Sequence, residues 1–141
     1  MPPKACIARV GKPLKEAPMA TLYERLGGVY SIATVIDDFI DRVMKDSRLN
    51  ANSLVDEAHH RVSPAGFKYL ATELVCSAAG GPQKYTGRSM KESHENLKIT
   101  ATEWEAFLDD LKQSLDKFGV PSAEQAELQA IVATTRADIV Y

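Results

Sequence analysis

The sequence predicts an all-α protein with a single domain. Apolar residues recur every three or four positions through most of the chain, which is the spacing of a helix with one buried face. No stretch alternates apolar and polar residues as a half-buried strand would, and there is no internal repeat. The 141 residues suffice for one apolar core and are few for two.

Two helices are expected before residue 46. A short one, residues 22–26, stops at Gly27 and Gly28, whose freedom at positive φ lets one helix end and the next begin at once. The second is amphipathic, with charged residues between its apolar positions. Its apolar stripe consists of Ile32, Val35, Ile36, Phe39, Ile40, Val43 and Met44.

The middle of the chain is predicted to hold a loop and then another helix. Between residues 47 and 61 the periodicity fades, and Asn50 and Asn52 compete with the backbone for hydrogen bonds, so we expect a loop with at most a helical turn. Ser63 and Pro64 supply an N-cap and a first helical residue. The stripe that follows consists of Phe67, Leu70, Ala71, Leu74, Val75 and Ala78, and Gly80, Gly81 and Pro82 end it.

Two more helices are expected after residue 99. Either Thr100 with Glu103 or Thr102 with Glu105 forms a capping box before the first of them. Its stripe consists of Trp104, Phe107, Leu108, Leu111, Leu115 and Phe118, and Gly119 ends it. The last helix opens at Pro121 and Ser122, and Leu128, Ile131, Val132, Thr135 and Ile139 share one of its faces.

Composition and charge exclude several classes of function. The net charge of −2 leaves no excess of cations for a nucleic acid, and no run reaches the roughly 18 apolar residues of a membrane span. Cys6 and Cys76 fit a reducing, cytoplasmic setting. Residues 1–20 hold scattered charges and prolines without a secretory apolar stretch. We expect a flexible extension there, with a short helix as the alternative, before a domain over 21–141.

Residues 80–97 do not suit an ordinary helix bundle. They read Gly-Gly-Pro-Gln-Lys-Tyr-Thr-Gly-Arg-Ser-Met-Lys-Glu-Ser-His-Glu-Asn-Leu, a polar, loop-like stretch with a lone histidine. Together with the Leu-Tyr-Glu-Arg-Leu-Gly-Gly of residues 22–28, this stretch resembles the truncated haemoglobins, above all their first group. The resemblance covers about residues 21–141. It implies a two-over-two helical sandwich around haem b that binds oxygen, nitric oxide or carbon monoxide.

His94 is the expected proximal ligand of the haem iron. The resemblance places it there, and imidazole is the usual neutral nitrogen donor to haem. Met90 and Leu97, about one turn away on either side, put His94 on a short apolar stripe that suits a porphyrin face. An isolated histidine at a helix end is otherwise most often solvated or capping, and the family motif is what favours the ligand role.

The resemblance and the helix faces together place twelve side chains around the haem. They are Phe39, Ile40, Phe67, Leu70, Ala71, Leu74, Tyr85, Met90, Lys91, Leu97, Trp104 and Phe107. Lys84 and Arg88, with Lys91, are candidates for pairing with the haem propionates, the alternative being an ordinary wet surface. Trp104 and Phe107 either pack on the porphyrin or are plain core.

The distal side departs from the family pattern. The family commonly carries a Phe-Tyr pair where this chain has Phe39 and Ile40, so the hydroxyl that holds bound dioxygen is missing. The aligned pocket is apolar, and we expect weaker retention of oxygen and easier oxidation. The segment between the two long helices is several residues longer than in typical members; it contains His59 and His60 and lacks the phenylalanine pair that the family usually has there. Either one of them points inward, as a donor or a sixth iron ligand, or both lie on the surface.

Three functions follow from these expectations. The first is reversible gas binding, with nitric oxide dioxygenation as an activity that the resemblance permits and that needs a separate reductase. The second is haem-dependent peroxidase chemistry, which requires an inward histidine at residue 59 or 60. The third is a haem-free helical interaction module. We expect a monomer or a weak homo-oligomer. The acidic pairs at residues 37–38 and 109–110 are interpreted as solvated helix faces, and Cys76 as packing.

Overall fold

The computed structural model describes residues 20–141, so the predicted N-terminal extension lies almost wholly outside the described residues. Within residues 20–141 there are helices and loops and no strand, and the single pairing of extended backbone is an isolated bridge between Ile99 and Val140. The predicted all-α class is confirmed. No helix in this part of the chain is long and apolar enough to cross a membrane.

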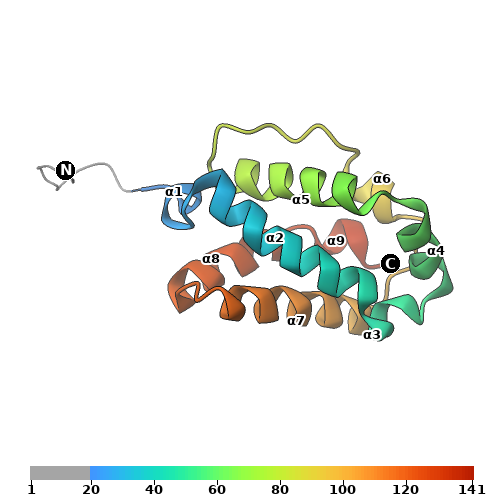
Figure 1. The fold of residues 1–141 in the computed structure, drawn as a ribbon. Helices are drawn as coiled ribbons and strands as arrows, with labels where there is room; N and C mark the ends of the chain where they lie inside the picture. The colour runs from blue at the N-terminus through green and yellow to red at the C-terminus, as the bar shows by residue number, and fades with distance from the viewer. Residues whose placement is uncertain (1–19) are drawn as a thin grey trace, which may run out of the picture.

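The helices of the described residues follow one another with short connections, apart from one long segment (Figure 1). They are α1 (Leu22–Arg25), α2 (Gly28–Lys45), α3 (Ser47–Asn50), α4 (Ser53–Arg61), α5 (Pro64–Ala78), α6 (Met90–His94), α7 (Ala101–Lys117), α8 (Ser122–Ala133) and α9 (Arg136–Ile139). The long segment, residues 79–89, returns along α5 to reach α6.

Helix α2 is the centre of the fold, because α5 packs on one side of it and α7 on the other (Figure 1). The predicted stripe of α2 is its buried face, with Ile36 and Ile40 almost completely enclosed. Leu111 and Leu115 of α7 meet this face, as does Cys76 of α5. The helical spacing of apolar residues therefore predicted the buried face of α2, whereas Ala78 and Phe118, also placed on predicted stripes, are exposed.

Capping side chains fix where α5 and α7 begin. The Ser63 hydroxyl accepts from the amide of Gly66 at 3.2 Å, with Pro64 as the first helical residue, as expected. Of the two possible capping boxes before α7, the one that forms joins Thr100 and Glu103. Glycines with positive φ follow α1, α5 and α7, namely Gly27, Gly80 and Gly119.

The expectation of a loop between residues 47 and 61 is wrong, because α3 and α4 fill it. The polar residues that suggested a loop are caps: Asp46 accepts from the amide of Arg48 at 2.9 Å, and Asn52 from that of Leu54 at 3.0 Å. Leu49 and Val55 are buried, so each short helix is anchored by one apolar side chain. One anchor per helix is too sparse to show as a periodic pattern.

The last predicted helix is in fact two helices. At the break, the hydroxyls of Thr134 and Thr135 donate to the carbonyl oxygens of Ile131 and Val132 at 2.6 and 2.7 Å. These side chains compete with the helix for its own acceptors, and the chain turns. As a result α9 packs against α6, and Ile139 is buried there rather than on the face of α8.

The acidic pairs are not wholly solvated as expected, because each pair divides between solvent and interior. Asp37 and Asp109 are exposed, whereas Asp38 is half-buried and Asp110 is only 4% exposed. Consecutive residues of a helix diverge by about 100°, so one member of each pair turns toward the neighbouring helix. Asp38 accepts there from the Ser114 hydroxyl at 2.7 Å.

Candidate functional site

Helix α6, which carries the candidate iron ligand, is fixed at its start by a capping box. The Ser89 hydroxyl accepts from the amide of Glu92 at 3.1 Å, and the Glu92 carboxylate accepts from the amide of Ser89 at 3.4 Å. The helix is only five residues long and none of them is fully buried. Local hydrogen bonds, rather than packing, therefore start this helix.

The His94 imidazole is held in one tautomer. Its Nδ1 lies 2.7 Å from the carbonyl oxygen of Met90, which can only accept, so the proton of the neutral ring is on Nδ1. Burial lowers the pKa of His94, while the bond to Met90 opposes that effect. The ring is neutral at pH 7 and its Nε2 keeps a lone pair, which is the state in which histidine binds a metal.

The chain after His94 is tied to the C-terminus. Helix α6 packs on α9, and the amide of Tyr141 donates to the carbonyl oxygen of Ile99 at 3.0 Å beside the Ile99–Val140 bridge. These contacts join residues about forty positions apart in the sequence. The end of the chain thus sets the position of the short α6 helix. The periodicity of apolar residues in the sequence did not indicate this contact.

The segment before α6 has anchors of its own. Glu73 of α5 accepts from both the amide and the hydroxyl of Thr86, at 3.1 and 2.7 Å. The Tyr85 hydroxyl donates to the carbonyl oxygen of Arg88 at 2.6 Å, and a Cβ on Gly87 would lie 2.6 Å from Cζ of Tyr85. The Tyr-x-Gly motif is therefore explained by a ring that occupies the space above the glycine.

Sequence reasoning did not single out Glu73, and it placed Tyr85 beside the cofactor. The structure gives the Tyr85 hydroxyl a partner within its own loop. The only signal for Glu73 was an acidic residue in a mostly apolar helix. Both side chains shape the segment that leads to His94.

Six of the predicted cofactor-contacting residues belong to one apolar cluster. They are Phe39, Ile40, Phe67, Ala71, Leu97 and Phe107. The Phe39 and Phe107 rings meet edge to face with centroids 5.2 Å apart, and the Trp104 ring stacks on Phe107 at 5.5 Å. Trp104 itself is only 2% exposed and is part of the interior.

Helix α5 leaves apolar surface uncovered. Although most of its residues are apolar, Cys76 is its only fully buried one, and Phe67, Leu70, Ala71 and Leu74 are half-buried. A soluble helix of this composition normally covers its stripe more completely. The face suits a flat apolar group lying against it.

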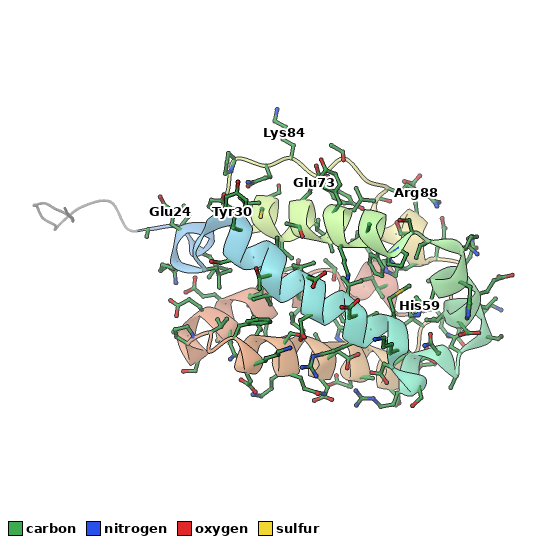
Figure 2. The ribbon with its side chains drawn as sticks, in the orientation of Figure 1. Glu24, Tyr30, His59, Glu73, Lys84 and Arg88 are labelled. Carbon is green, nitrogen blue, oxygen red and sulfur yellow. The ribbon has the colours of Figure 1, made fainter. Side chains whose placement is uncertain are left out.

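The candidate propionate partners are all exposed. Lys84 points away from the helices, and Arg88 donates to the carbonyl oxygen of Glu92 at 3.2 Å (Figure 2). Lys91 lies on α6 itself, three residues before His94. Lys91 is therefore the cation that shares an element with the candidate iron ligand.

The two histidines of α4 point apart, as expected for neighbours on a helix. His59 is half-buried, and its Nδ1 lies 2.6 Å from Oδ1 of Asn50, whose amide nitrogen donates to the carbonyl of Met44 at 2.9 Å. Nδ1 of His59 therefore carries the proton, and burial lowers the pKa of this ring. The His60 side chain is 78% exposed.

Residues 21–141 match the family model of the bacterial-like globins. That range contains every residue of the site described above. The chain belongs to the bacterial-like globin family.

Relatives of this globin are truncated haemoglobins. It is 35% identical over 118 residues to a group 1 truncated haemoglobin of Synechocystis, and the match covers 80% of this chain and 90% of the relative. It is 25% identical over 119 residues to a group 1 truncated haemoglobin of Tetrahymena pyriformis, and that match covers 84% of this chain and 93% of the relative. The Fe(III) structure of a Tetrahymena pyriformis truncated haemoglobin superposes with a TM-score of 0.76 at 25% identity, over 86% of this chain and 98% of that one. A 2/2 haemoglobin of Synechococcus, with covalently attached haem, gives 0.75 at 27% identity over the same shares.

The predicted resemblance to group 1 and the two-over-two fold are confirmed, and this globin is a haem b protein that binds gas ligands. Its own residues fit that cofactor. The neutral His94 offers an Nε2 lone pair, and the half-buried face of α5 offers apolar surface for a porphyrin.

Proposed function

We propose that His94 is the proximal ligand in this globin and that a diatomic gas binds opposite it in an apolar pocket. The observation that carries the proposal is the hydrogen bond from Nδ1 of His94 to the Met90 carbonyl, because it leaves Nε2 unprotonated, with a lone pair available for a metal. The haem supplies the iron at which the gas binds. Oxygen, nitric oxide and carbon monoxide all belong to the ligand class.

The remaining residues of the proposed pocket cover the haem and exclude water from it. In the proposal Ile40, Phe67 and Ala71 form the distal wall, while Leu97 and Phe107 support the proximal side. They belong to one apolar cluster in the structure, which supports this assignment. Leu70, Leu74, Met90 and Tyr85 complete the contacts, and Lys91 pairs with a propionate.

The distal wall lacks a hydroxyl, and a histidine of α4 is the candidate polar group for this side. Of the pair, His59 is the one we assign, because it is half-buried and neutral while His60 is exposed. Its Nδ1 donates to Asn50, so Nε2 carries no proton and is the atom free to coordinate the iron as a sixth ligand. Without a hydrogen-bond donor in the distal wall, bound oxygen would be short-lived.

The same neutral His59 favours a second candidate function, haem-dependent peroxidase chemistry. A distal imidazole with a free Nε2 can take up a proton from peroxide, as general base catalysis requires.

Nitric oxide dioxygenation fits the gas-binding function as well. It requires an electron donor, which we propose is a separate cytoplasmic reductase acting on a monomer or weak homo-oligomer. Membership of the globin family disfavours the haem-free helical module.

The decisive experiment compares His94→Ala with His60→Ala in their ferric, ferrous and CO-bound states. Resonance Raman spectra of the ferrous wild-type protein should show an iron–histidine stretch. His94→Ala should lose this band, and added imidazole should restore a five-coordinate spectrum. His60→Ala, an exposed control on another helix, should keep it. An iron–histidine band that survives in His94→Ala would overturn the assignment.

Replacing His59 distinguishes haem-dependent peroxidase chemistry from gas binding alone. Peroxide-driven oxidation of a small dye should fall at least about tenfold in His59→Gln and stay unchanged in His60→Gln if His59 is the distal base. Equal rates in both variants would leave gas binding as the function and place both histidines outside the pocket. The CO-bound optical spectrum checks that each variant is fully loaded.

A further inference from the structure

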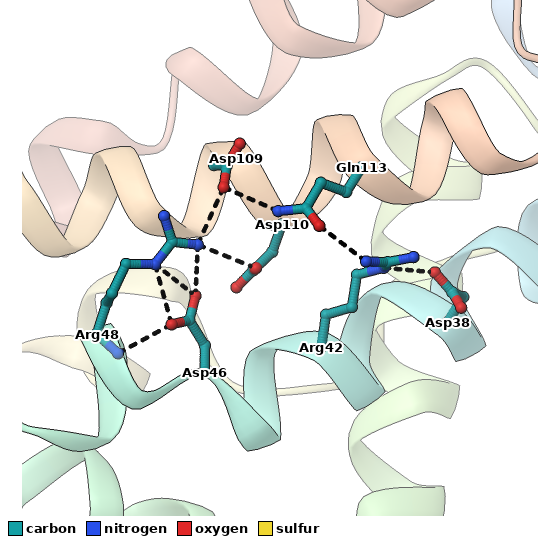
Figure 3. Close-up of polar contacts among 7 residues, drawn as sticks. All are labelled: Asp38, Arg42, Asp46, Arg48, Asp109, Asp110 and Gln113. Carbon is teal, nitrogen blue, oxygen red and sulfur yellow. Dashed lines mark hydrogen bonds and ion pairs between the residues drawn. The ribbon is translucent and has the colours of Figure 1, made fainter.

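A cluster of three carboxyl groups and one guanidinium joins α3 to α7 (Figure 3). Arg48 binds both carboxylate oxygens of Asp46, at 3.0 Å through Nε and 2.9 Å through Nη2. Its Nη2 also contacts Asp109 at 3.0 Å and Oδ1 of Asp110 at 3.4 Å. The side chains of Asp46 and Asp110 are 7% and 6% exposed.

The charges of this cluster do not balance if every group is ionised. Three carboxylates, Asp46, Asp109 and Asp110, would face a single cation, Arg48. In addition, Oδ2 of Asp110 is buried and has no hydrogen-bond partner among the described residues. An ionised carboxylate oxygen left unpaired in the interior is costly. A proton on Oδ2 removes both difficulties, since it cancels one charge and makes that atom a donor.

The acid–base properties of the two groups agree with this arrangement. Burial, followed by the facing Asp46 carboxylate, raises the pKa of Asp110 to about 7, while Asp109 adds a little and Arg48 opposes. Arg48 is the main reason that the pKa of Asp46 falls to about 2. Asp46 therefore stays ionised as an acceptor while Asp110 holds the proton.

We propose that Asp46 and Asp110 share one proton at neutral pH, and that this proton fastens α3 to α7 so that the contact loosens in alkali. The protonated Asp110 donates from Oδ2 to the Asp46 carboxylate. When the proton leaves to water, two carboxylates face each other in a buried place and repel. Asp46 also caps α3, so the repulsion acts on the start of that helix.

The contact reaches the haem side through one residue. Asn50, at the end of α3, accepts from Nδ1 of His59 and so orients that ring. Movement of α3 would displace Asn50 and release His59. This last step rests on the proposed distal role of His59, whereas the shared proton does not depend on it.

The sign of the pH effect follows from the raised pKa of Asp110. The folded chain keeps this proton up to about pH 7, whereas an unfolded chain loses it near 3.8. The contribution of Asp110 to stability is therefore complete below about pH 4 and declines as the pH rises to about 7.

The test is a carbon-13 NMR titration of aspartate carboxyl groups in the full-length, diamagnetic CO-bound protein from pH 4.5 to 9. The Asp110 carboxyl should titrate near pH 7. In Asp46→Asn, where asparagine still caps α3, the midpoint should fall by about one pH unit or more. Asp109→Asn, at the exposed neighbour, should move it far less.

A second readout follows the side-chain amide of Asn50. Its resonance should shift with the Asp110 midpoint in the wild type and be independent of pH in Asp110→Asn, which keeps a neutral side chain there. A wild-type Asp110 that titrates below pH 5, or a midpoint unchanged by Asp46→Asn, would refute the shared proton even if Asp110→Asn fails to fold. A chain without a Soret band whose Asp110 still titrates near pH 7 would contradict the proposed function and leave this inference standing.

Discussion

The Nδ1 atom of His94 donates to the carbonyl oxygen of Met90 at 2.7 Å, one turn earlier on the same short helix. This bond fixes which ring nitrogen carries the proton and how the ring is oriented. In metal sites such a partner also raises the basicity of the ligating nitrogen. The backbone of α6 thus prepares the imidazole before any cofactor binds.

Acidification should release the cofactor at a pH set by His94. Burial keeps the pKa of His94 below its usual 6.5, so the folded chain leaves Nε2 unprotonated where an unfolded chain would be half-protonated. The contribution of His94 to stability is therefore complete above pH 6.5 and lost as the pH falls below it. Transfer of haem to an excess of apomyoglobin, followed at the Soret band between pH 8 and 4.5, should accelerate below pH 6.5. A rate that is flat from pH 7 to 5 would contradict this.

Replacing Ile40 by tyrosine should slow oxygen dissociation. A hydroxyl at this position would donate to a bound ligand that carries negative charge, and such bonds contribute about 1.5–3 kcal/mol, or roughly 10- to 100-fold in rate. Ile40 is only 1% exposed, so the larger ring must also be accommodated. Ile40→Phe is the matched control, because it adds the ring without the hydroxyl. Equal dissociation rates in the two variants, measured by stopped flow, would place Ile40 away from the ligand.

His59 should contribute to the pH dependence of stability and His60 should not. Burial lowers the pKa of His59, so its share of the folding free energy is present above pH 6.5 and falls away in acid. In His59→Gln, whose amide can still donate to Asn50, the loss of stability between pH 7 and 5 should be smaller than in the wild type. Urea unfolding followed by circular dichroism measures it. The exposed His60→Gln should track the wild type at every pH.

A methyl group at Gly87 should destabilise the segment that leads to His94. The new Cβ would lie 2.6 Å from Cζ of Tyr85, so the ring must move and its bond to the Arg88 carbonyl breaks, at a cost of about 1–3 kcal/mol. Gly66→Ala serves as the comparison, because its Cβ would meet Ser63 at an ordinary 3.6 Å inside α5, where alanine is favoured by about 0.5–1 kcal/mol. Thermal unfolding should therefore shift in opposite directions. A Gly87→Ala protein as stable as the wild type would show that the Tyr85 ring is not confined.

The sequence by itself determined the long helices and singled out the segment that carries the proposed iron ligand. The stripes of α2 and α7 are regular because each helix buries one face along several turns, and such burial produces a periodic pattern of apolar residues. The stripe of α5 has the same spacing, although Cys76 is its only fully buried residue. The turn glycines and His94 could also be identified from the sequence. A positive φ favours glycine, and an iron ligand of the proposed kind requires a nitrogen donor such as histidine.

Only the tertiary structure decided the features that depend on a single contact between distant residues. Asp110 and Asp109 are alike in sequence, and the approach of α3 to α7 buries one and leaves the other exposed. His59 is distinguished from His60 by its bond to Asn50, and α6 is placed by the bridge from Ile99 to Val140. One side chain or one bridge leaves no periodicity, so packing alone reveals which residue makes the contact.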